Sequence, residues 1–270
     1  MMEASLNIPI GIANSVSANF GYDVFDALKY EEQSNFDLIQ IFLNSTHIND
    51  AIFLKKLKDY LLGSHDKPVY FHAEGFLNRE FQRSEYSKKL FEFVSNFEHK
   101  KLIIHFDETE QLEEILDIIS YFSDHEPILY LENYFRLSGK VNAEKNLRKY
   151  LALFTLANSQ QFNLAPVIDI PRFFNASLKF TNDEALQWCF ELFNYFGNRG
   201  IPILLHLIDA TKPTQERNTY CTIGEGYIPF REIFQFMLKI KPPIEGVILE
   251  FEDKIHPLKS RDNLISFLSK

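Results

Sequence analysis

The sequence of 270 residues has few cysteines, no long apolar run and no targeting segment that we recognise. Its two cysteines, Cys189 and Cys221, lie far apart, which excludes a disulfide framework and makes a reducing cytoplasm the expected compartment. The N-terminus has no basic segment followed by a long apolar stretch, so we predict no signal peptide. No apolar run approaches the ~20 residues of a membrane-spanning helix, so we expect no membrane association.

The chain also lacks an excess of basic residues and the usual phosphate-binding motifs. Its formal net charge is −9, which gives no general attraction to nucleic acid or to anionic membranes. Neither GxGxxG nor GxxxxGK[ST] occurs, so open nucleotide-binding α/β folds lose their usual fingerprints. Nothing in the sequence indicates a dimer face, and the oligomeric state stays open.

What the sequence does contain is a regular alternation of short apolar runs and longer amphipathic stretches. Buried parallel strands read as nearly continuous hydrophobic runs, and eight such runs occur. They are Pro9–Ala13, Leu38–Phe42, Val69–His72, Leu102–His105, Ile128–Glu132, Val167–Asp169, Ile203–His206 and Gly246–Glu250. Proline precedes several of them, which is typical of chain entering a strand after a turn.

The stretches between these runs have the spacing of amphipathic helices. They are Ala51–Leu62, Tyr86–Phe97, Leu112–Phe122, Lys145–Ala157, Asn182–Phe196 and Pro229–Leu238. Alternating strands and helices predict a parallel sheet, and eight strands over this length favour a closed (β/α)₈ TIM barrel. No linker divides the chain, so we expect one domain over residues 1–270.

Six consecutive predicted strands end at residue types that bind metal. These residues are His72, His105, Glu132, Asp169, His206 and Glu250. The active site of such a barrel lies where strands end, so we expect these side chains to converge there. Imidazole and carboxylate together suit Zn²⁺ or Mn²⁺ better than Mg²⁺ or Ca²⁺. The sequence therefore predicts a site for one or two divalent ions.

Each of these residues, taken alone, has an ordinary structural explanation. A lone histidine after a strand is usually a hydrogen-bonded core residue, and a lone carboxylate is often a helix cap. The even spacing of Glu132, Asp169, His206 and Glu250, one strand–helix unit apart, favours the metal site. The other histidines, His47, His65, His99, His125 and His256, are interpreted as solvated. Cys221 has no adjacent motif that would make it a nucleophile.

Several short motifs in a fixed order resemble the xylose isomerase-like TIM barrels, the superfamily of sugar-phosphate isomerases and epimerases and of endonuclease IV. The motifs are HAEGFLN from His72, LENY around Glu132, VIDIPR around Asp169, HLIDATK from His206, IGEGYIPF from Ile223 and ILEF around Glu250. The resemblance implies a metal held by Glu132, Asp169, His206 and Glu250. In the endonuclease branch it implies a second metal at His72 and His105.

Where endonuclease IV has the ligands of a third metal, this chain departs from the pattern. Arg172, Asn218 and Tyr220 stand at the matching positions, which puts trimetal phosphodiesterase chemistry in doubt. A DNA-wedging role for the loop after His72 is also in doubt, because Gly75 and Phe76 stand at the positions that matter for it in that branch. An arginine cannot bind a cation, but it can clamp a phosphate or a carboxylate.

Three functions remain open from the sequence. The favoured one is a metal-dependent isomerase or epimerase of a sugar or sugar phosphate, with Glu132 and Glu250 relaying a proton and Arg172 or Lys212 binding a substrate anion. The alternative is an endonuclease IV-like phosphodiesterase that acts on nucleic acid. The third is a non-enzymatic barrel with a structural metal. The metal content per chain would separate the first two.

Overall fold

Strands and helices alternate along the chain. The computed structural model describes residues 8–123, 127–213 and 219–269. The strands are β1 (Ile10–Ala13), β2 (Ile39–Leu43), β3 (Val69–Leu77), β4 (Lys101–Phe106), β5 (Ile128–Glu132), β6 (Leu164–Asp169), β7 (Ile203–Leu207), β8 (Asp209–Ala210), β9 (Tyr220–Cys221) and β10 (Ile244–Leu249). The helices are α1 (Val24–Gln33), α2 (Ser45–Asn49), α3 (Ala51–Gly63), α4 (Arg79–Arg83), α5 (Glu85–Val94), α6 (Leu112–Ser123), α7 (Lys140–Ser159), α8 (Asn182–Gly197), α9 (Phe230–Ile240) and α10 (His256–Leu268).

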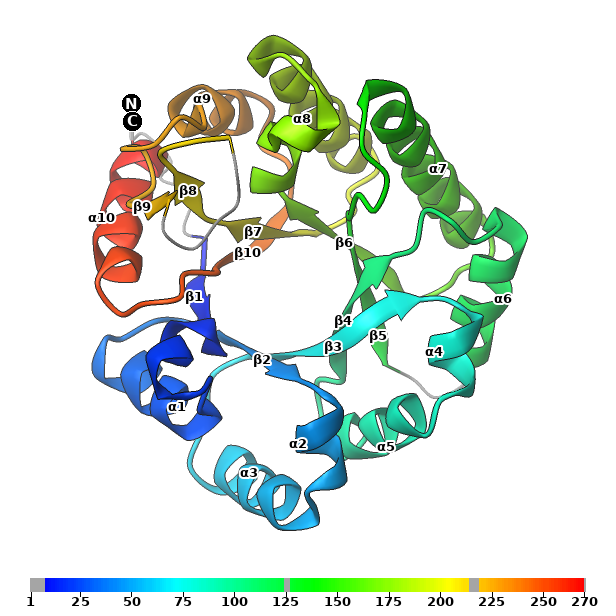
Figure 1. The fold of residues 1–270 in the computed structure, drawn as a ribbon, viewed down its shortest axis with the longest axis vertical. Coiled ribbons are helices and arrows are strands. Elements are labelled where there is room, and N and C mark those ends of the chain that lie inside the picture. Colours follow the sequence, from blue (N-terminus) through cyan, green and yellow to red (C-terminus); the bar gives the residue numbers. More distant parts are fainter. Residues whose placement is uncertain (1–7, 124–126, 214–218, 270) are drawn as a thin grey trace.

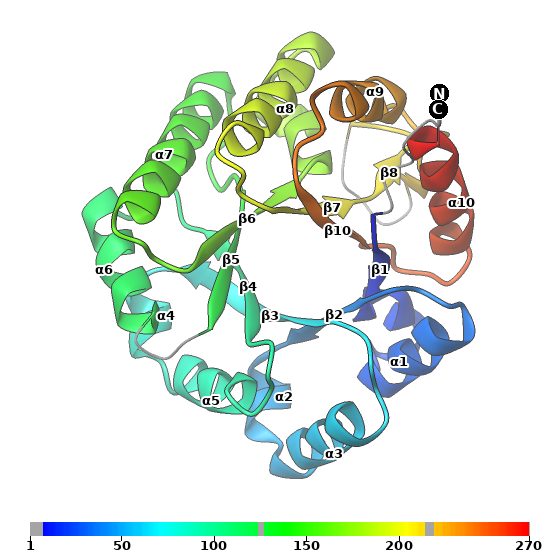
Figure 2. The same cartoon turned by 180° about the vertical axis from the view of Figure 1, so that it is seen from behind.

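Eight of the strands close into a parallel barrel in the order β1-β10-β7-β6-β5-β4-β3-β2, and helices surround it (Figure 1, and from behind in Figure 2). The (β/α)₈ TIM barrel predicted from the sequence is therefore confirmed. The two short strands β8 and β9 form a separate antiparallel pair after β7. Among the described residues, no helix is both long enough and apolar enough to cross a bilayer.

The ends of most strands lie one or two residues from their predicted bounds, and two strands differ more for a local reason. β3 continues past His72 to Leu77, with a shift in its register against β4 between His72 and Phe76. Glu74 and Gly75 interrupt the apolar run in that stretch, so the sequence did not indicate that the strand continues. β6 begins at Leu164, two residues before the proline that we took to mark its start, and Pro166 pairs within the strand with Leu131.

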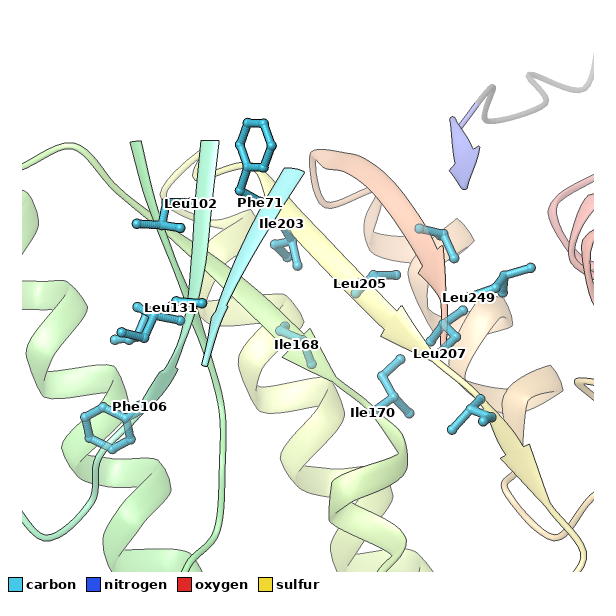
Figure 3. Close-up of a cluster of buried hydrophobic side chains, with 14 of the residues drawn as sticks. Phe71, Leu102, Phe106, Leu131, Ile168, Ile170, Ile203, Leu205, Leu207 and Leu249 are labelled. Atoms are coloured by element: carbon cyan, nitrogen blue, oxygen red, sulfur yellow. The ribbon is translucent and has the colours of Figure 1, made fainter. Parts of the chain in front are cut away.

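Side chains alternate between the two faces of each strand, and this alternation divides the core into two parts. Outward-facing residues pack under the helices, and Figure 3 shows such a cluster from neighbouring strands, including Leu131, Ile168 and Leu205. Inward-facing residues form a second, smaller apolar cluster inside the barrel. It consists of Ala13, Leu38, Tyr70, Ile103, Tyr130, Ala165, Val167, Leu204 and Ile248.

At the amino end of the strands, a largely buried ion pair lies beneath this inner cluster. Glu245 accepts hydrogen bonds of 2.8 Å from the hydroxyls of Tyr70 and Tyr130 and of 2.6 Å from the ammonium of Lys101. Lys101 also donates to the hydroxyl of Tyr70 at 3.0 Å. Because each charged group has an opposite charge and hydrogen-bond partners, the cost of removing it from water is offset.

Candidate metal centre at the carboxyl end of the barrel

The carboxyl ends of the strands carry a ring of polar side chains. The six residues predicted from strand ends lie here, on or directly after β3, β4, β5, β6, β7 and β10. The strand pairing places His105 opposite Glu132 and Asp169 opposite His206. A seventh member, Gln40 on β2, is 3% exposed and was not predicted. The sequence feature that could have indicated Gln40 is its position as a polar residue inside an apolar run, two positions before Phe42.

Two histidines face the carboxylate of Glu132. Nε2 of His72 lies 3.1 Å from Oε2 of Glu132, and Nε2 of His105 lies 3.6 Å from Oε1. The other ring nitrogen of each is directed at a backbone carbonyl: His72 Nδ1 at Ala73 (2.8 Å) and His105 Nδ1 at Gly75 (3.0 Å). A carbonyl only accepts, so each Nδ1 is the donor, and each Nε2 is directed at the carboxylate of Glu132.

His206 lies on the other side of Glu132 and is completely buried. Its Nδ1 lies 3.2 Å from Oε2 of Glu132 and 3.2 Å from Oε1 of Glu250. Neither of its ring nitrogens has a hydrogen-bond partner of good geometry. Gln40 donates a 2.9 Å hydrogen bond from Nε2 to Oε1 of Glu250, while its own Oε1 is buried without a partner. Such unpaired buried atoms are costly, and they point to a missing ligand.

Arg172 brings a permanent positive charge into the ring. Its Nε and one terminal nitrogen donate to Oε1 of Glu132 at 3.0 and 2.8 Å, and its Nε also pairs with the carboxylate of Asp169. The guanidinium lies 4.1 Å from the ring centre of Tyr134, a cation–π contact. Arg172 thus binds two carboxylates of its own chain, whereas from the sequence we expected it to bind a substrate anion.

The charges around Glu132 control its ionisation and that of its neighbours. Burial raises the pKa of Glu132, but His105, Arg172 and His206 outweigh burial and hold that pKa well below its usual value. Burial lowers the pKa of His105 to about 3, so this ring is neutral near pH 7. Burial also raises the pKa of Asp169 to about 8, although Arg172 opposes the rise. A neutral imidazole beside an ionised carboxylate is the state that binds a metal.

A cavity of about 280 Å³ opens beside this ring. The residues that line it are Ala13, Asn14, Ser15, Tyr22, Gln40, Phe42, His72, His105, Tyr220, Glu250 and Glu252. Glu250 is the more accessible of the two predicted catalytic glutamates, since its side chain is 25% exposed and that of Glu132 is 1% exposed. The volume lies near the lower end of the range for small-molecule sites.

The GEG turn has a structural explanation in the buried carboxylate of Asp209. It accepts hydrogen bonds from the backbone N–H groups of Ala210 (2.8 Å), Gly224 (2.9 Å) and Gly226 (3.0 Å). A Cβ atom on Gly226 would lie 2.1 Å from Oδ1 of Asp209, so only glycine fits there. This anchor fixes the segment that follows β9, and β9 contributes Tyr220 to the cavity.

Other predicted residues lie away from the ring. Lys212 is exposed and does not line the cavity, and Asn218 and His125 lie outside the described residues. Phe76 packs against the ring of His105 with 5.5 Å between ring centres. The interpretation of His65 as solvated is wrong: its side chain is 2% exposed and lies 3.3 Å from the buried carboxylate of Glu31. That carboxylate needs partners in the apolar interior, and His65 is one of them.

The donor set fits a divalent transition metal. Within the described parts of the chain, one group of at least three potential ligands has its ligand atoms all within 4.8 Å of one another, and it consists of His72, His105 and Glu132. Backbone carbonyls orient both imidazoles, as is usual for metal-binding histidines. His206, whose Nε2 has no hydrogen-bond partner, adds a further imidazole beside Glu132. Imidazole with carboxylate favours Zn²⁺, Mn²⁺ or a similar ion.

Comparison with known proteins identifies the fold. No family model matches the sequence, and no curated protein matches it. Among solved structures, the chain is similar to IolI protein with a bound zinc atom, at a TM-score of 0.67 and 12% identity over 97% of this chain and 98% of that one. It is also similar to D-allulose 3-epimerase from Methylomonas sp. in complex with D-allulose, at a TM-score of 0.56 and 11% identity over 96% of each chain.

A third similar structure is a sugar phosphate isomerase/epimerase from Parabacteroides distasonis, with a TM-score of 0.58 and 14% identity over 98% of this chain and 96% of that one. All three alignments cover nearly the whole of both chains, so the likeness concerns the complete barrel. The likeness therefore shows that this chain has the fold of these proteins, a complete (β/α)₈ barrel.

Proposed function

We propose that this protein is a divalent-metal-dependent enzyme that isomerises or epimerises a small polyhydroxylated carbonyl compound by proton transfer. The observation that carries this proposal is the cavity at the barrel mouth, where Glu250 faces the same space as His72 and His105. A carboxylate that can take a proton thus lies beside the donors of a metal. The similarity to structures of sugar isomerases and epimerases supports the same reaction class.

The donors available to the metal are His72, His105, Glu132, Asp169, His206 and Glu250. When bound, the metal supplies Lewis-acid polarisation of a carbonyl, which acidifies the neighbouring C–H. The chain itself supplies the base, and we assign this role to Glu250 because it reaches the cavity. Gln40 holds Oε1 of Glu250, and His206 lies 3.2 Å from the same oxygen, so the carboxylate is fixed in place.

The two predicted catalytic glutamates differ in their access to the cavity, and this difference bears on the type of reaction. Glu132 is buried and bound by Arg172, whereas Glu250 lines the cavity. Epimerisation by inversion at one carbon needs acid–base groups on both faces of that carbon, and isomerisation can use a single base on one face. Of the two predicted catalytic glutamates only Glu250 lines the cavity, and Glu252 is the second carboxylate there, so both reactions stay within the proposal.

The lining of the cavity also bears on the substrate. None of the described residues that line it is lysine or arginine. A phosphate group is usually recognised by such cations or by a helix N-terminus. We therefore propose an uncharged sugar or polyol-like carbonyl compound, bound through hydroxyl contacts to Gln40, Asn14 and Tyr220, over a sugar phosphate.

Exchange of carbon-bound hydrogen with solvent tests this function without knowledge of the product. The Mn²⁺- or Zn²⁺-loaded protein is incubated in D₂O with a panel of aldoses and ketoses, including D-allulose, and deuterium at the carbon next to the carbonyl is followed by NMR. We expect exchange with at least one sugar and its loss in Glu250→Gln. Absence of exchange across the panel with fully metal-loaded protein would contradict the proposal.

A second function is favoured by the trio of His72, His105 and Glu132, which matches the set that the resemblance assigns to endonuclease IV. Against it, Arg172 is already neutralised by two carboxylates, and the cavity has no basic lining among its described residues. Cleavage of an oligonucleotide with an abasic site by the zinc-loaded protein would establish the phosphodiesterase in place of the isomerase.

A further inference from the structure

We propose that the guanidinium of Arg172 takes the place of a metal ion between Glu132 and Asp169, so that the protein binds a single divalent ion at His72, His105 and Glu132. This single-ion site rests on the metal dependence of the proposed function but not on its reaction. It departs from the four-ligand set that the family resemblance implies, in which Asp169, His206 and Glu250 would complete the coordination of Glu132.

Arg172 is held firmly between the two carboxylates. Two of its nitrogens donate to the same oxygen of Glu132, at 3.0 and 2.8 Å, and its Nε also pairs with Oδ2 of Asp169. The face of the guanidinium is covered by Tyr134 at 4.1 Å. A planar cation held by two carboxylates and an aromatic ring is fixed in position, and it carries its charge at every relevant pH.

The charge of Arg172 disfavours a metal on the Asp169 side of the ring. The guanidinium contacts both carboxyl groups that a metal between Glu132 and Asp169 would need, and a divalent ion beside it would meet direct repulsion. Asp169 pairs with Arg172, and no third ligand atom of the described residues joins Asp169 and Glu132 within 4.8 Å. The Asp169 side of the ring is therefore closed to a second cation.

The side of the ring formed by His72 and His105 favours a cation instead. There the Nε2 atoms of His72 and His105 face the carboxylate of Glu132 at 3.1 and 3.6 Å, with both Nδ1 atoms committed to the carbonyls of Ala73 and Gly75. Two imidazole nitrogens and a carboxylate that converge in this way can hold a divalent ion in place of a proton. Both histidines line the cavity, so an ion has a path to this side.

The arrangement leaves Glu250 free of metal. If the ion lies at the two histidines, neither Glu250 nor His206 is required as a ligand, and Glu250 keeps its carboxylate for proton transfer. Arg172 then limits the site to one ion, while His206, whose Nδ1 lies 3.2 Å from an oxygen of each glutamate, stands between Glu132 and Glu250.

Metal titration of the purified chain tests the inference without any substrate. After removal of metal with a chelator, Zn²⁺ or Co²⁺ alone is titrated by calorimetry, and bound metal is counted by mass spectrometry. We expect one ion per chain. His105→Gln should weaken binding by more than about 100-fold, and Asp169→Asn by less than about tenfold. The opposite order, with Asp169→Asn or His206→Gln abolishing binding and His105→Gln tolerated, would overturn the inference.

Arg172→Gln tests the role of the guanidinium directly. Without the positive charge, Asp169 and Glu132 become available, and we expect a second ion per chain. Arg136→Gln is the matched control, because Arg136 pairs with Asp107 near the barrel mouth and contacts none of the metal donors; it should leave one ion. A single ion of unchanged affinity in folded Arg172→Gln would refute the role of Arg172. If that variant does not fold, as judged by its thermal transition, the comparison of His105→Gln with Asp169→Asn decides the location.

Discussion

The two ends of the barrel interior each contain a glutamate beside a fixed cation, and they differ in how completely their polar atoms are paired. At the amino end, Glu245 binds Lys101, Tyr70 and Tyr130, and the carboxylate has donors for both of its oxygens. At the carboxyl end, Glu132 faces three imidazoles, and both ring nitrogens of His206 have no hydrogen-bond partner.

This difference distinguishes the stabilising network around Glu245 from the ligand-binding site around Glu132. A fully paired polar cluster contributes to stability and specifies one conformation, whereas unpaired buried atoms destabilise the metal-free protein and persist where a ligand satisfies them. In barrels of this kind the amino face is associated with stability and the carboxyl face with catalysis. We therefore expect substitutions at the two ends to affect different measured quantities.

The largest effect that we expect comes from Glu250→Gln at the carboxyl end. The amide keeps the size of the side chain but cannot accept the substrate proton, so kcat should fall about 10²–10⁴-fold, roughly 3–5 kcal/mol in activation free energy. The free energy of unfolding should change little, since the side chain is partly exposed. Steady-state kinetics on a substrate found by deuterium exchange, together with urea unfolding, check both. Unchanged kcat would remove Glu250 from the chemistry.

At the amino end, Glu245→Ala should reverse this pattern. It leaves the largely buried ammonium of Lys101 and two tyrosine hydroxyls without their acceptor, so we expect a loss of about 3 kcal/mol in the free energy of unfolding. Metal stoichiometry should stay at the wild-type value. A stability loss below about 1 kcal/mol, or altered metal binding, would break the division between the two ends.

The same network gives a pH dependence. Burial raises the pKa of Glu245, but Lys101, Tyr130 and Tyr70 outweigh burial, so its folded pKa lies below the usual value of 4.5. The stabilisation is therefore complete above about pH 4.5 and is lost as the pH falls through the folded pKa. Unfolding curves of the wild type should converge on those of Glu245→Ala as the pH is lowered below that range.

Asp209→Ala tests whether pairing, and not location, determines stability. Asp209 lies at the carboxyl end, but its carboxylate is paired with backbone N–H groups of the GEG turn. Its loss leaves these donors unpaired, so we expect about 2 kcal/mol of destabilisation and a raised KM through the displaced Tyr220. Gly226→Ala should act in the same direction because of its contact with Asp209. Glu225→Ala, an exposed change in the same turn, is the control.

The smallest effect is expected from Gln40→Leu. The substitution removes the 2.9 Å hydrogen bond to Glu250 and the unpaired carbonyl oxygen of the Gln40 amide. We expect about a tenfold fall in kcat/KM, equal to about 1.4 kcal/mol, because Glu250 loses one of two groups that orient it. Stability should rise or stay unchanged, since a buried polar group is replaced by an apolar one. A marked fall in stability would instead assign Gln40 to the structural part of the ring.

Much of the fold could be predicted from the sequence because buried parallel strands are continuous apolar runs. Ile128–Glu132 coincides with β5, and the strand-end residues from His72 to Glu250 lie at one end of the barrel. The helices α1 and α10 were not among the predicted ones. Charged and polar residues interrupt their apolar faces, so packing against the barrel defines these helices more than periodicity does.

The site was harder to predict where it depends on contacts between distant residues. Arg172 follows Asp169 by three residues, and nothing in that spacing indicates that its guanidinium reaches Glu132, forty residues earlier. Gln40 was missed because a single neutral amide in an apolar run is compatible with an ordinary buried strand and does not indicate a site. His65 was misplaced because its partner Glu31 lies on a different element, α1.

The apolar layer between the two ends has a consequence for engineering. Ile103, Val167, Leu204 and Ile248 form part of a buried apolar layer inside the barrel between Glu245 and the histidine ring. Groups separated in this way and sharing no partners usually show additive free-energy changes, within about 0.5 kcal/mol. Substitutions at the amino end can therefore raise the free energy of unfolding while substitutions at the carboxyl end change the reaction. The two sets of changes should be nearly independent.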